Sequence, residues 1–214
     1  MTVVDVQFRL TGKLIPVDHG YHLFSAVSEI IPELHSSHDE TGLHPITGQL
    51  AGNRSLAITE RSFLTIRLSS EQIALVLPLA GKTLQLNGCP IYVGVPRVRA
   101  LIPSTRVYSR LVVIKGFMEP EPFLEAACRQ LQDMEIKGKP SLIIQSKIAE
   151  ANMDKHTGSR SLYLRRTIKI RDKEVVGFAL RVEELTAEES IHLQEKGLGG
   201  RRRFGCGIFI PDRR

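Results

Sequence analysis

The sequence predicts an α+β protein built from two successive units that share one order of strands and helices. The chain has 214 residues, enough for one large domain or two small ones, and its apolar content of 42% can fill a core. Alternating apolar residues predict strands, and apolar residues three or four positions apart predict helices. These two patterns follow one another in the same order in each half of the chain.

The first half opens with a strand pattern over residues 2–12. We expect Asp18 to cap a helix that begins near Tyr21, and Pro32 to kink or end that helix. The rest of this half holds a pair of strands, a helix that starts with a capping-box pattern, and a strand-rich stretch, at residues 55–58 with 63–68, 69–80, and 83–102.

The second half repeats the order. Thr186 and Glu189 form a capping box for the last helix, which Gly197 ends. The other elements are a strand, a helix, a strand, a hairpin and a closing strand, at residues 110–117, 120–134, 141–145, 162–171 with 174–182, and 206–210. Strand–helix–strand–strand–helix–strand is the ferredoxin-like order, so we expect two tandem ferredoxin-like domains, residues 1–105 and 106–214.

The composition favours an anionic partner inside a reducing compartment. The formal net charge is +6 and the pI about 9.4, as in many proteins that bind nucleic acid or an anionic surface. The three cysteines are scattered and form no CxxC pair, so we expect a cytoplasmic protein. The sequence has no apolar run of 18 residues and no signal-peptide pattern at its start, so we expect no contact with a membrane.

The most specific pattern lies near the C-terminus. Two Gly-x-Gly units enclose five residues, three of which are consecutive arginines. Such a loop can turn its N–H groups outward as an anion nest, and arginine adds forked donors that match phosphate oxygens. We therefore expect a phosphate-binding loop made by Gly197, Gly199, Gly200, Arg201, Arg202, Arg203, Gly205 and Gly207.

This loop, placed after the last helix of a tandem unit, resembles that of the CRISPR repeat-processing endoribonucleases of the RAMP superfamily. Their signature is Gly-apolar-Gly, five residues, Gly-apolar-Gly, and residues 197–207 fit it without a gap. Residues 21–28 and the pair Leu34–His35 also look like the family's first helix and the histidine after it. Residues 42–46 resemble the Myxococcus-type branch.

The resemblance implies an activity and a partner. Members of the family cut the repeat of a CRISPR precursor RNA, with the substrate's own 2′-hydroxyl as nucleophile and without a metal or other cofactor. The products carry a 2′,3′-cyclic phosphate and a 5′-hydroxyl. We therefore expect a repeat stem-loop as the partner, and other subunits of a CRISPR effector complex as further candidates.

Histidine is the side chain best suited to proton transfer near neutral pH, and five of the seven histidines lie between positions 19 and 44. The resemblance implies that His35 is the general acid or base. Ser28 lies seven residues earlier and shares a helix face with His35 if the helix continues that far. Other family members often have a tyrosine near that place, which puts a His–Tyr pair in doubt here. His44 is the second candidate, because its loop is flanked by glycine and proline.

A metal site is an alternative for the same histidines. The spacings His19-x-x-His22 and His35-x-x-His38 are typical of metal ligands, and acidic residues lie nearby. No cysteine joins the set and no zinc-finger spacing is matched, so we expect no metal.

A second basic cluster surrounds the hairpin of the second half. Arg165, Lys169 and Arg171 stand at odd positions and are expected to share one strand face. An ordinary solvated face explains most charge runs, but together with the three arginines of the loop the cluster fits a groove for the phosphates of a stem. The expected RNA-binding residues of this cluster are Arg160, Arg165, Arg166, Lys169 and Arg171.

Three functions are compatible with these features. The first is a metal-independent endoribonuclease, and the second is a non-catalytic RNA-binding subunit of a CRISPR effector complex. The third is a metal-dependent hydrolase. Only the first requires an essential histidine together with activity that survives a chelator.

Overall fold

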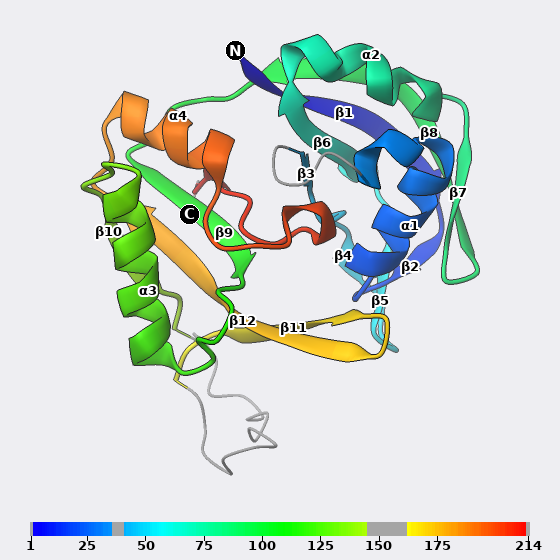
Figure 1. Cartoon of the computed structure of the whole chain (residues 1–214). Coiled ribbons are helices and arrows are strands. Elements are labelled where there is room, and N and C mark those ends of the chain that lie inside the picture. Colours follow the sequence, from blue (N-terminus) through cyan, green and yellow to red (C-terminus); the bar gives the residue numbers. More distant parts are fainter. Residues whose placement is uncertain (1, 36–40, 145–161, 213–214) are drawn as a thin grey trace. The chain divides into compact units, whose positions relative to one another are not determined.

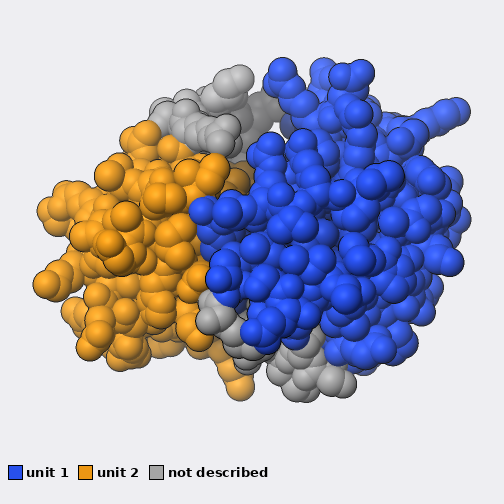
Figure 2. Space-filling model, turned by 90° about the horizontal axis from the view of Figure 1, so that it is seen from above, with its two compact units in different colours: residues 1–101, 168–174, 201–205 blue, residues 102–167, 175–200, 206–214 orange. Residues whose placement is uncertain are grey.

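The computed structural model describes residues 2–35, 41–144 and 162–212. It divides into two compact units, which are coloured separately in Figure 2. Unit 1 comprises residues 1–101, 168–174 and 201–205, and unit 2 comprises residues 102–167, 175–200 and 206–214. The sequence led us to expect two uninterrupted domains. In the structure, two short segments of the second half pack with the first.

Unit 1 is built on a five-stranded antiparallel sheet with the order β3-β6-β1-β8-β7 (Figure 1). In a ferredoxin-like unit the first of the four strands lies between the third and the fourth. Here β1 lies between β6 and β8, and β7 is an additional strand at the edge. Val6 of β1 pairs with Ile66 of β6 on one side and with Val98 of β8 on the other. The strands are β1 (Val3–Gly12), β3 (Gly42–Leu43), β6 (Phe63–Ser69), β7 (Thr83–Leu86) and β8 (Cys89–Ala100).

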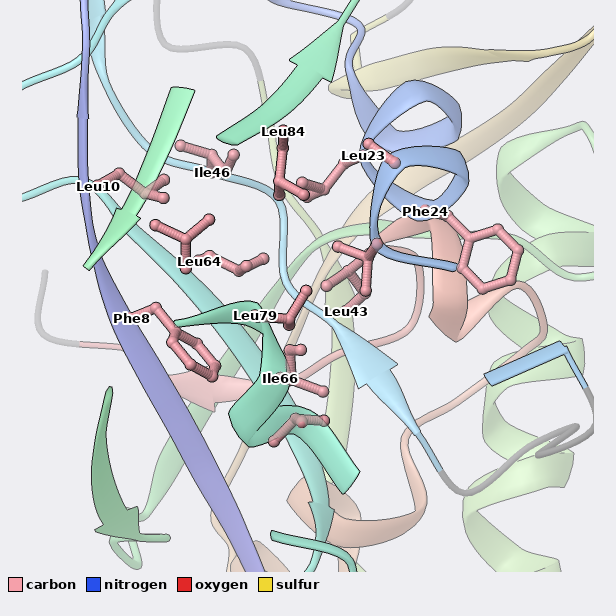
Figure 3. Close-up of a cluster of buried hydrophobic side chains, with 14 of the residues drawn as sticks. Phe8, Leu10, Leu23, Phe24, Leu43, Ile46, Leu64, Ile66, Leu79 and Leu84 are labelled. Carbon is pink, nitrogen blue, oxygen red and sulfur yellow. The ribbon is translucent and has the colours of Figure 1, made fainter. Parts of the chain in front are cut away.

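The helices of unit 1 cover one face of this sheet. Phe8 of β1, Leu23 of helix α1 and Ile66 of β6 are fully buried in one cluster, drawn in Figure 3. Even-numbered residues of β1 face this core because side chains alternate along a strand. The helical segments within residues 1–101 are α1 (Gly20–Ile30), the 3₁₀ turns η1 (Pro32–His35), η2 (Ser70–Gln72) and η3 (Leu77–Leu79), and the short α2 (Ile73–Val76).

The expected pairing of the strands near residues 55–58 and 63–68 is wrong. Strand β5 (Ser55–Ala57) pairs with β2 (Leu14–Pro16) and β4 (Gln49–Leu50) in a separate three-stranded sheet. Strand β6 is buried along almost its whole length and fills a central place beside β1. β6 is covered on both faces and is a central strand of the main sheet, whereas β5, with one buried residue, is the central strand of the small sheet β2-β5-β4.

The expected cap of α1 is also wrong. His19 occupies the N-cap position without a side-chain hydrogen bond. Asp18 lies one residue too early to cap, and its Oδ2 accepts a hydrogen bond of 2.8 Å from the backbone N–H of Lys169 instead.

Unit 2 repeats the ferredoxin-like order, with its sheet arranged β10-β12-β9-β13 and β11 paired to β12. Phe123 and Phe178 meet in its core with ring centroids 4.9 Å apart. Two tandem ferredoxin-like folds are thereby confirmed. The elements are β9 (Arg106–Val112), α3 (Pro120–Asp133), β10 (Lys139–Leu142), β11 (Arg165–Ile170), β12 (Lys173–Glu183), α4 (Ala187–Lys196) and β13 (Ile210–Pro211).

Two predictions from local sequence patterns near the end of the chain are confirmed. Thr186 and Glu189 form the predicted capping box, and α4 ends at Gly197, which has a φ of 71°. The closing strand is shorter than the expected residues 206–210. The N–H of Gly207 donates to the carbonyl of Leu111 and its own carbonyl accepts from Leu198, so this stretch packs as a loop before β13 begins.

Candidate active site and RNA interface

The glycines of the C-terminal loop fold it against the protein instead of opening it to an anion. The N–H of Gly199 donates to Oε1 of Gln130 at 2.8 Å, and that of Gly200 to the carbonyl of Val113 at 2.9 Å. The amides of Gly197, Gly205 and Gly207 likewise donate to protein carbonyls. The five glycine amides are therefore used within the protein and do not form the expected outward-facing nest.

Two of these positions require glycine for space. Gly199 and Gly207 have φ values of 73° and 65°, in the left-handed region that favours glycine. A Cβ at Gly199 would collide with the carbonyl of Val113, and one at Gly207 with that of Leu198. These glycines fix the path of the loop on which the arginines stand.

The three arginines have different surroundings. Arg201 is exposed in a left-handed conformation, and the 3₁₀ turn η4 (Arg202–Phe204) follows it. Arg202 is only 6% exposed. The Arg203 guanidinium lies 5.3 Å from the ring centroid of Phe24 and 5.2 Å from that of Phe204. Since Phe204 is buried in the core of unit 1, it anchors the turn that presents Arg201 and Arg203.

The basic hairpin reaches unit 1 through its tip. Ile168 and Ile170 of β11 pack against the unit 1 core, and Lys169 between them is exposed. Arg171 was expected on the same strand face as Arg165 and Lys169, but it lies in the turn with a φ of 53°. This left-handed backbone conformation belongs to the turn through which the chain reverses from β11 into β12.

A pocket of about 680 Å³ opens in unit 1, where α1, η1, the hairpin tip and the arginine turn meet. His35 and four cationic side chains line it, against two carboxylates, so the pocket attracts anions. Its polar and charged lining residues are Tyr21, Ser25, Ser28, Glu29, His35, Arg171, Asp172, Lys173, Arg201 and Arg203.

His35 ends η1 and is exposed to this pocket. Its ring meets that of Phe24 edge to face, with centroids 5.2 Å apart and an interplanar angle of 82°. The contact holds the imidazole against the Phe24 ring in the wall of the pocket.

Ser28 also lines the pocket, but its hydroxyl is committed elsewhere. It is 5% exposed, and Oγ donates to the carbonyl of Phe24 at 2.7 Å within α1. A hydroxyl that donates to its own helix has no proton to offer a substrate. This geometry does not fit the catalytic role expected for Ser28.

His44 does not line the pocket, contrary to the expectation that its loop presents it to RNA. Its side chain is 13% exposed, and Nε2 lies 3.5 Å from Oδ1 of Asp5. Burial lowers the pKa of His44, and the nearby positive charges of Arg67 and Arg202 lower it further, while Asp5 opposes both. A neutral, enclosed imidazole is a structural group here.

Asp5 and Arg67 form the buried ion pair beside His44. The Nε and Nη2 atoms of Arg67 donate to the two carboxylate oxygens of Asp5 at 2.8 and 2.9 Å. Burial alone would raise the pKa of Asp5, but the nearby His44 imidazole and the hydrogen bonds from Arg67 outweigh it and hold that pKa well below its usual range. The pair joins β1 to β6.

The pair His19 and His22, considered as metal ligands, is not arranged as a metal site. His19 is 1% exposed, its Nδ1 lies 2.8 Å from the carbonyl of Pro16, and its Nε2 accepts from the N–H of Ile46 at 2.9 Å. Both ring nitrogens are therefore occupied by protein contacts. His38, Asp39 and Glu40 lie outside the described residues, and within the described ranges no group of three or more potential ligands converges.

The structure brings together only part of the expected RNA-binding set. Arg171, Arg201 and Arg203 line the pocket with Lys173, whereas Arg165, Arg166, Lys169 and Arg202 do not. Arg160 lies outside the described residues. The sequence did not indicate the aromatic wall of Phe24 and Phe204. The one apolar residue in the five-residue insert, Phe204, was the available signal.

Comparison with known proteins identifies the family. The family model described as Cas6 Crispr matches residues 4–214. The chain belongs to the Cas6 family. It is 35% identical over 211 residues to the CRISPR-associated endonuclease Cas6 of Myxococcus xanthus strain DK1622, and the match covers 99% of this chain and 82% of that protein. The resemblance seen in the glycine loop is confirmed.

Solved structures support the same fold for this Cas6-family chain. A structure from Pyrococcus furiosus, described as a Cas6-related gene, matches with a TM-score of 0.66 and 14% identity, covering 99% of this chain and 100% of that one. A RAMP protein described as binding different RNA substrates matches with a TM-score of 0.62 and 10% identity, covering 98% and 99%. Within the described residues, no helix is long and apolar enough to cross a membrane.

Proposed function

We propose that this Cas6-family chain is an endoribonuclease that cuts CRISPR precursor RNA within the repeat stem-loop. The observation that carries the proposal is the unit 1 pocket, where an exposed histidine shares one concave site with four cationic side chains. Those side chains come from the hairpin tip and the arginine turn, far apart in the sequence. An acid–base group beside a concentration of positive charge is what cleavage of a phosphodiester demands.

In the proposed reaction the 2′-oxygen of the RNA attacks the adjacent phosphorus while the bond from phosphorus to the 5′-oxygen breaks. The 2′-hydroxyl must lose a proton and the 5′-oxygen must gain one. We assign one of these transfers to His35, and Tyr21 and water are the candidates for the other. The products are a 2′,3′-cyclic phosphate and a 5′-hydroxyl.

The cationic residues act on the charge that develops at phosphorus. Arg201 and Arg203 stand on an anchored turn, and a forked guanidinium suits two phosphate oxygens. Arg171 and Lys173 face the same pocket from the hairpin. Fixed positive charge of this kind stabilises the phosphorane transition state, so the reaction as proposed needs no metal.

A gel assay of repeat RNA cleavage in EDTA tests this function. Wild-type protein should cut, and His35→Ala should lower the single-turnover rate by about 10²- to 10⁴-fold, the usual effect of losing a positioned acid or base. Ser28→Ala serves as the matched control from the same pocket, since its hydroxyl proton is already donated to Phe24. It should stay within a few-fold of wild type.

The alternatives predict other results. A non-catalytic RNA-binding subunit would bind the repeat and leave it intact, with or without magnesium. A metal-dependent hydrolase would cut only when the chelator is omitted. Full activity of His35→Ala in EDTA would keep the reaction class and remove His35 from it.

A further inference from the structure

A groove of about 670 Å³ lies in unit 2, between the C-terminal end of α3 and one side of α4 (Figure 1). All of its lining residues belong to unit 2, and it shares none of them with the pocket of unit 1. Its lining consists of five apolar residues, four glutamates and one histidine. We call it the acidic groove.

Helical spacing puts the α4 part of the lining on one face. Glu188, Ile191, His192 and Glu195 stand at positions i, i+3, i+4 and i+7, so they follow one another along one side of the helix. Leu193, which is buried in the core of unit 2, lies on the other side. The packing of α4 therefore leaves this face to the groove.

The apolar part of the groove is continuous with the core of unit 2. Ile136 is buried in that core, and Met134 packs against it. Pro103 and Ala187 are exposed, and Ile191 is half-buried. A partner that covers these side chains removes apolar surface from water, and the flexible thioether of Met134 adapts to the shape of what it meets.

One of the four glutamates is used by the fold. The carboxylate oxygens of Glu189 accept hydrogen bonds from the backbone N–H groups of Thr186 and Lys137 at 2.9 and 2.7 Å, and these bonds lower its pKa. Its charge stays in the groove, but its oxygens already have partners.

The other three glutamates, Glu135, Glu188 and Glu195, have their charge available to a partner. None of them forms an ion pair within the described part of the chain, and no lysine or arginine of that part lines the groove. The chain as a whole carries a formal charge of +6. A concentration of carboxylates on a basic protein attracts a cationic partner and repels the phosphates of RNA.

Glu135 stands where the fold favours glycine. It follows α3 with a φ of 58°, in the left-handed region, and its N–H donates to the carbonyl of Gln132 at 2.9 Å. Glycine and asparagine are the usual residues at this position after a helix, and a carboxylate there lies at the negative end of the helix dipole. Both effects cost stability, and such departures from local preference are expected at functional positions.

We propose that the acidic groove binds a segment of another protein in which apolar side chains are flanked by lysine or arginine. The apolar side chains cover Met134 and Ile191, and the cationic heads reach the three available carboxylates while their methylene stems lie along the apolar lining. Charge complementarity selects this occupant, because an uncharged or acidic segment leaves the carboxylates unpaired. The inference goes beyond the proposed function and does not depend on it.

The test uses the whole protein and the synthetic peptide acetyl-KKLKKLKK-amide as the probe. Amide chemical shifts in ¹H–¹⁵N spectra report where the peptide binds, and their titration gives the affinity. We expect the shifts to change over residues 134–136 and 187–195. The peptide acetyl-KKSKKSKK-amide keeps the charge and lacks the leucines, so it should bind about tenfold more weakly.

Charge reversal tests the part of the carboxylates. The variant Glu188→Lys, Glu195→Lys should lower the affinity for the leucine peptide by about tenfold or more, since two attractive contacts become repulsive. The matched control is Glu60→Lys, Glu125→Lys, which changes the net charge equally at exposed sites outside the groove. It should bind the peptide as wild type does.

The variant Glu135→Gly separates binding from folding. It should raise the melting temperature, because glycine suits a φ of 58°. It should also lower the affinity for the leucine peptide by about threefold, the size of one exposed charge pair. A variant that is more stable and binds more weakly does not owe its loss of binding to unfolding.

Four results would overturn the inference. One is equal binding of the leucine and serine peptides, which would mean attraction by charge alone. The others are unchanged peptide affinity in both groove variants, no shift changes at about millimolar peptide, and changes at the groove caused by an unstructured oligouridine instead of the peptide.

Discussion

At the scale of the residue, two histidines of one chain segment have opposite surroundings. His35 ends a 3₁₀ turn and is exposed to the pocket, while His44 is enclosed beside Asp5 and Arg67. The sequence made both candidates for catalysis. Only packing separates them, because the environment of a side chain decides whether it can exchange protons with a substrate.

The Asp5–Arg67 pair carries a stability prediction. Asp5→Asn leaves the guanidinium of Arg67, which is 1% exposed, without its carboxylate. We expect a loss of about 3 kcal/mol in the free energy of unfolding at pH 7, as for other broken buried pairs. Glu184→Gln breaks the exposed pair with Lys139 and should cost less than about 1 kcal/mol in the same urea titration.

The difference between wild type and Asp5→Asn also has a defined pH dependence. The folded pKa of Asp5 is depressed, so the unfolded chain takes up this proton first as the pH falls. The stability difference should stay constant from pH 7 to about pH 5 and shrink below the unfolded value of about 3.9. A difference that grows with acidity would contradict the assignment of the ion pair.

At the scale of the element, the hairpin tip, residues 168–174, makes polar and apolar contacts within unit 1. Asp18 accepts the hydrogen bond from the Lys169 amide, and Ile168 and Ile170 on either side of Lys169 are partly buried and pack against the core. The contact places Arg171 and Lys173 in the wall of the pocket.

Asp18→Ala should therefore loosen the tip. A hydrogen bond to a charged group contributes about 1.5–3 kcal/mol, so amide exchange over residues 168–174 should speed up by about tenfold or more. We expect RNA affinity to fall with it, since two cations lose their position. Asp133→Ala, on an exposed site of α3, is the control and should leave the exchange pattern unchanged.

Elements with a local signal could be predicted from the sequence, and those set by distant partners could not. The capping box at Thr186 and the end of α4 at Gly197 depend on a few neighbouring residues. The partner of β5 depends on β2, some 40 residues away in the chain, and no turn signal encodes that pairing. Asp18 looked like a cap because its true partner, Lys169, lies 151 residues further on.

At the scale of the whole molecule, the candidate site is assembled from both halves of the sequence. The hairpin tip and the arginine turn, residues 168–174 and 201–205, belong to the same compact unit as α1 and η1. The glycine signature predicted where the arginines would be, and the resemblance implied His35. Neither could show that Arg202 is buried while its two neighbours line the pocket.

The salt dependence of RNA binding should depend on the two arginines that line the pocket, Arg201 and Arg203. Each phosphate contact adds close to one to the slope of log affinity against log salt. The variant Arg201→Ala, Arg203→Ala should lower that slope by about 1 to 2, and Arg129→Ala, exposed on α3, should not change it. The measurement is the affinity of each variant for repeat RNA between about 50 and 300 mM salt, from which the slopes are compared. An unchanged slope in the double variant would remove both arginines from the phosphate contacts.

In the proposed reaction the RNA supplies its own nucleophile beside His35, and one substituted substrate can decide whether it does. Repeat RNA with a single 2′-deoxy nucleotide just upstream of the cut should bind wild-type protein with nearly unchanged affinity, because one hydroxyl is a small part of the interface. In EDTA it should remain uncut, while the all-ribose repeat is cleaved to a 2′,3′-cyclic phosphate. Cleavage of the deoxy substrate at that position would rule out the 2′-hydroxyl as nucleophile, since water would then be the attacking group.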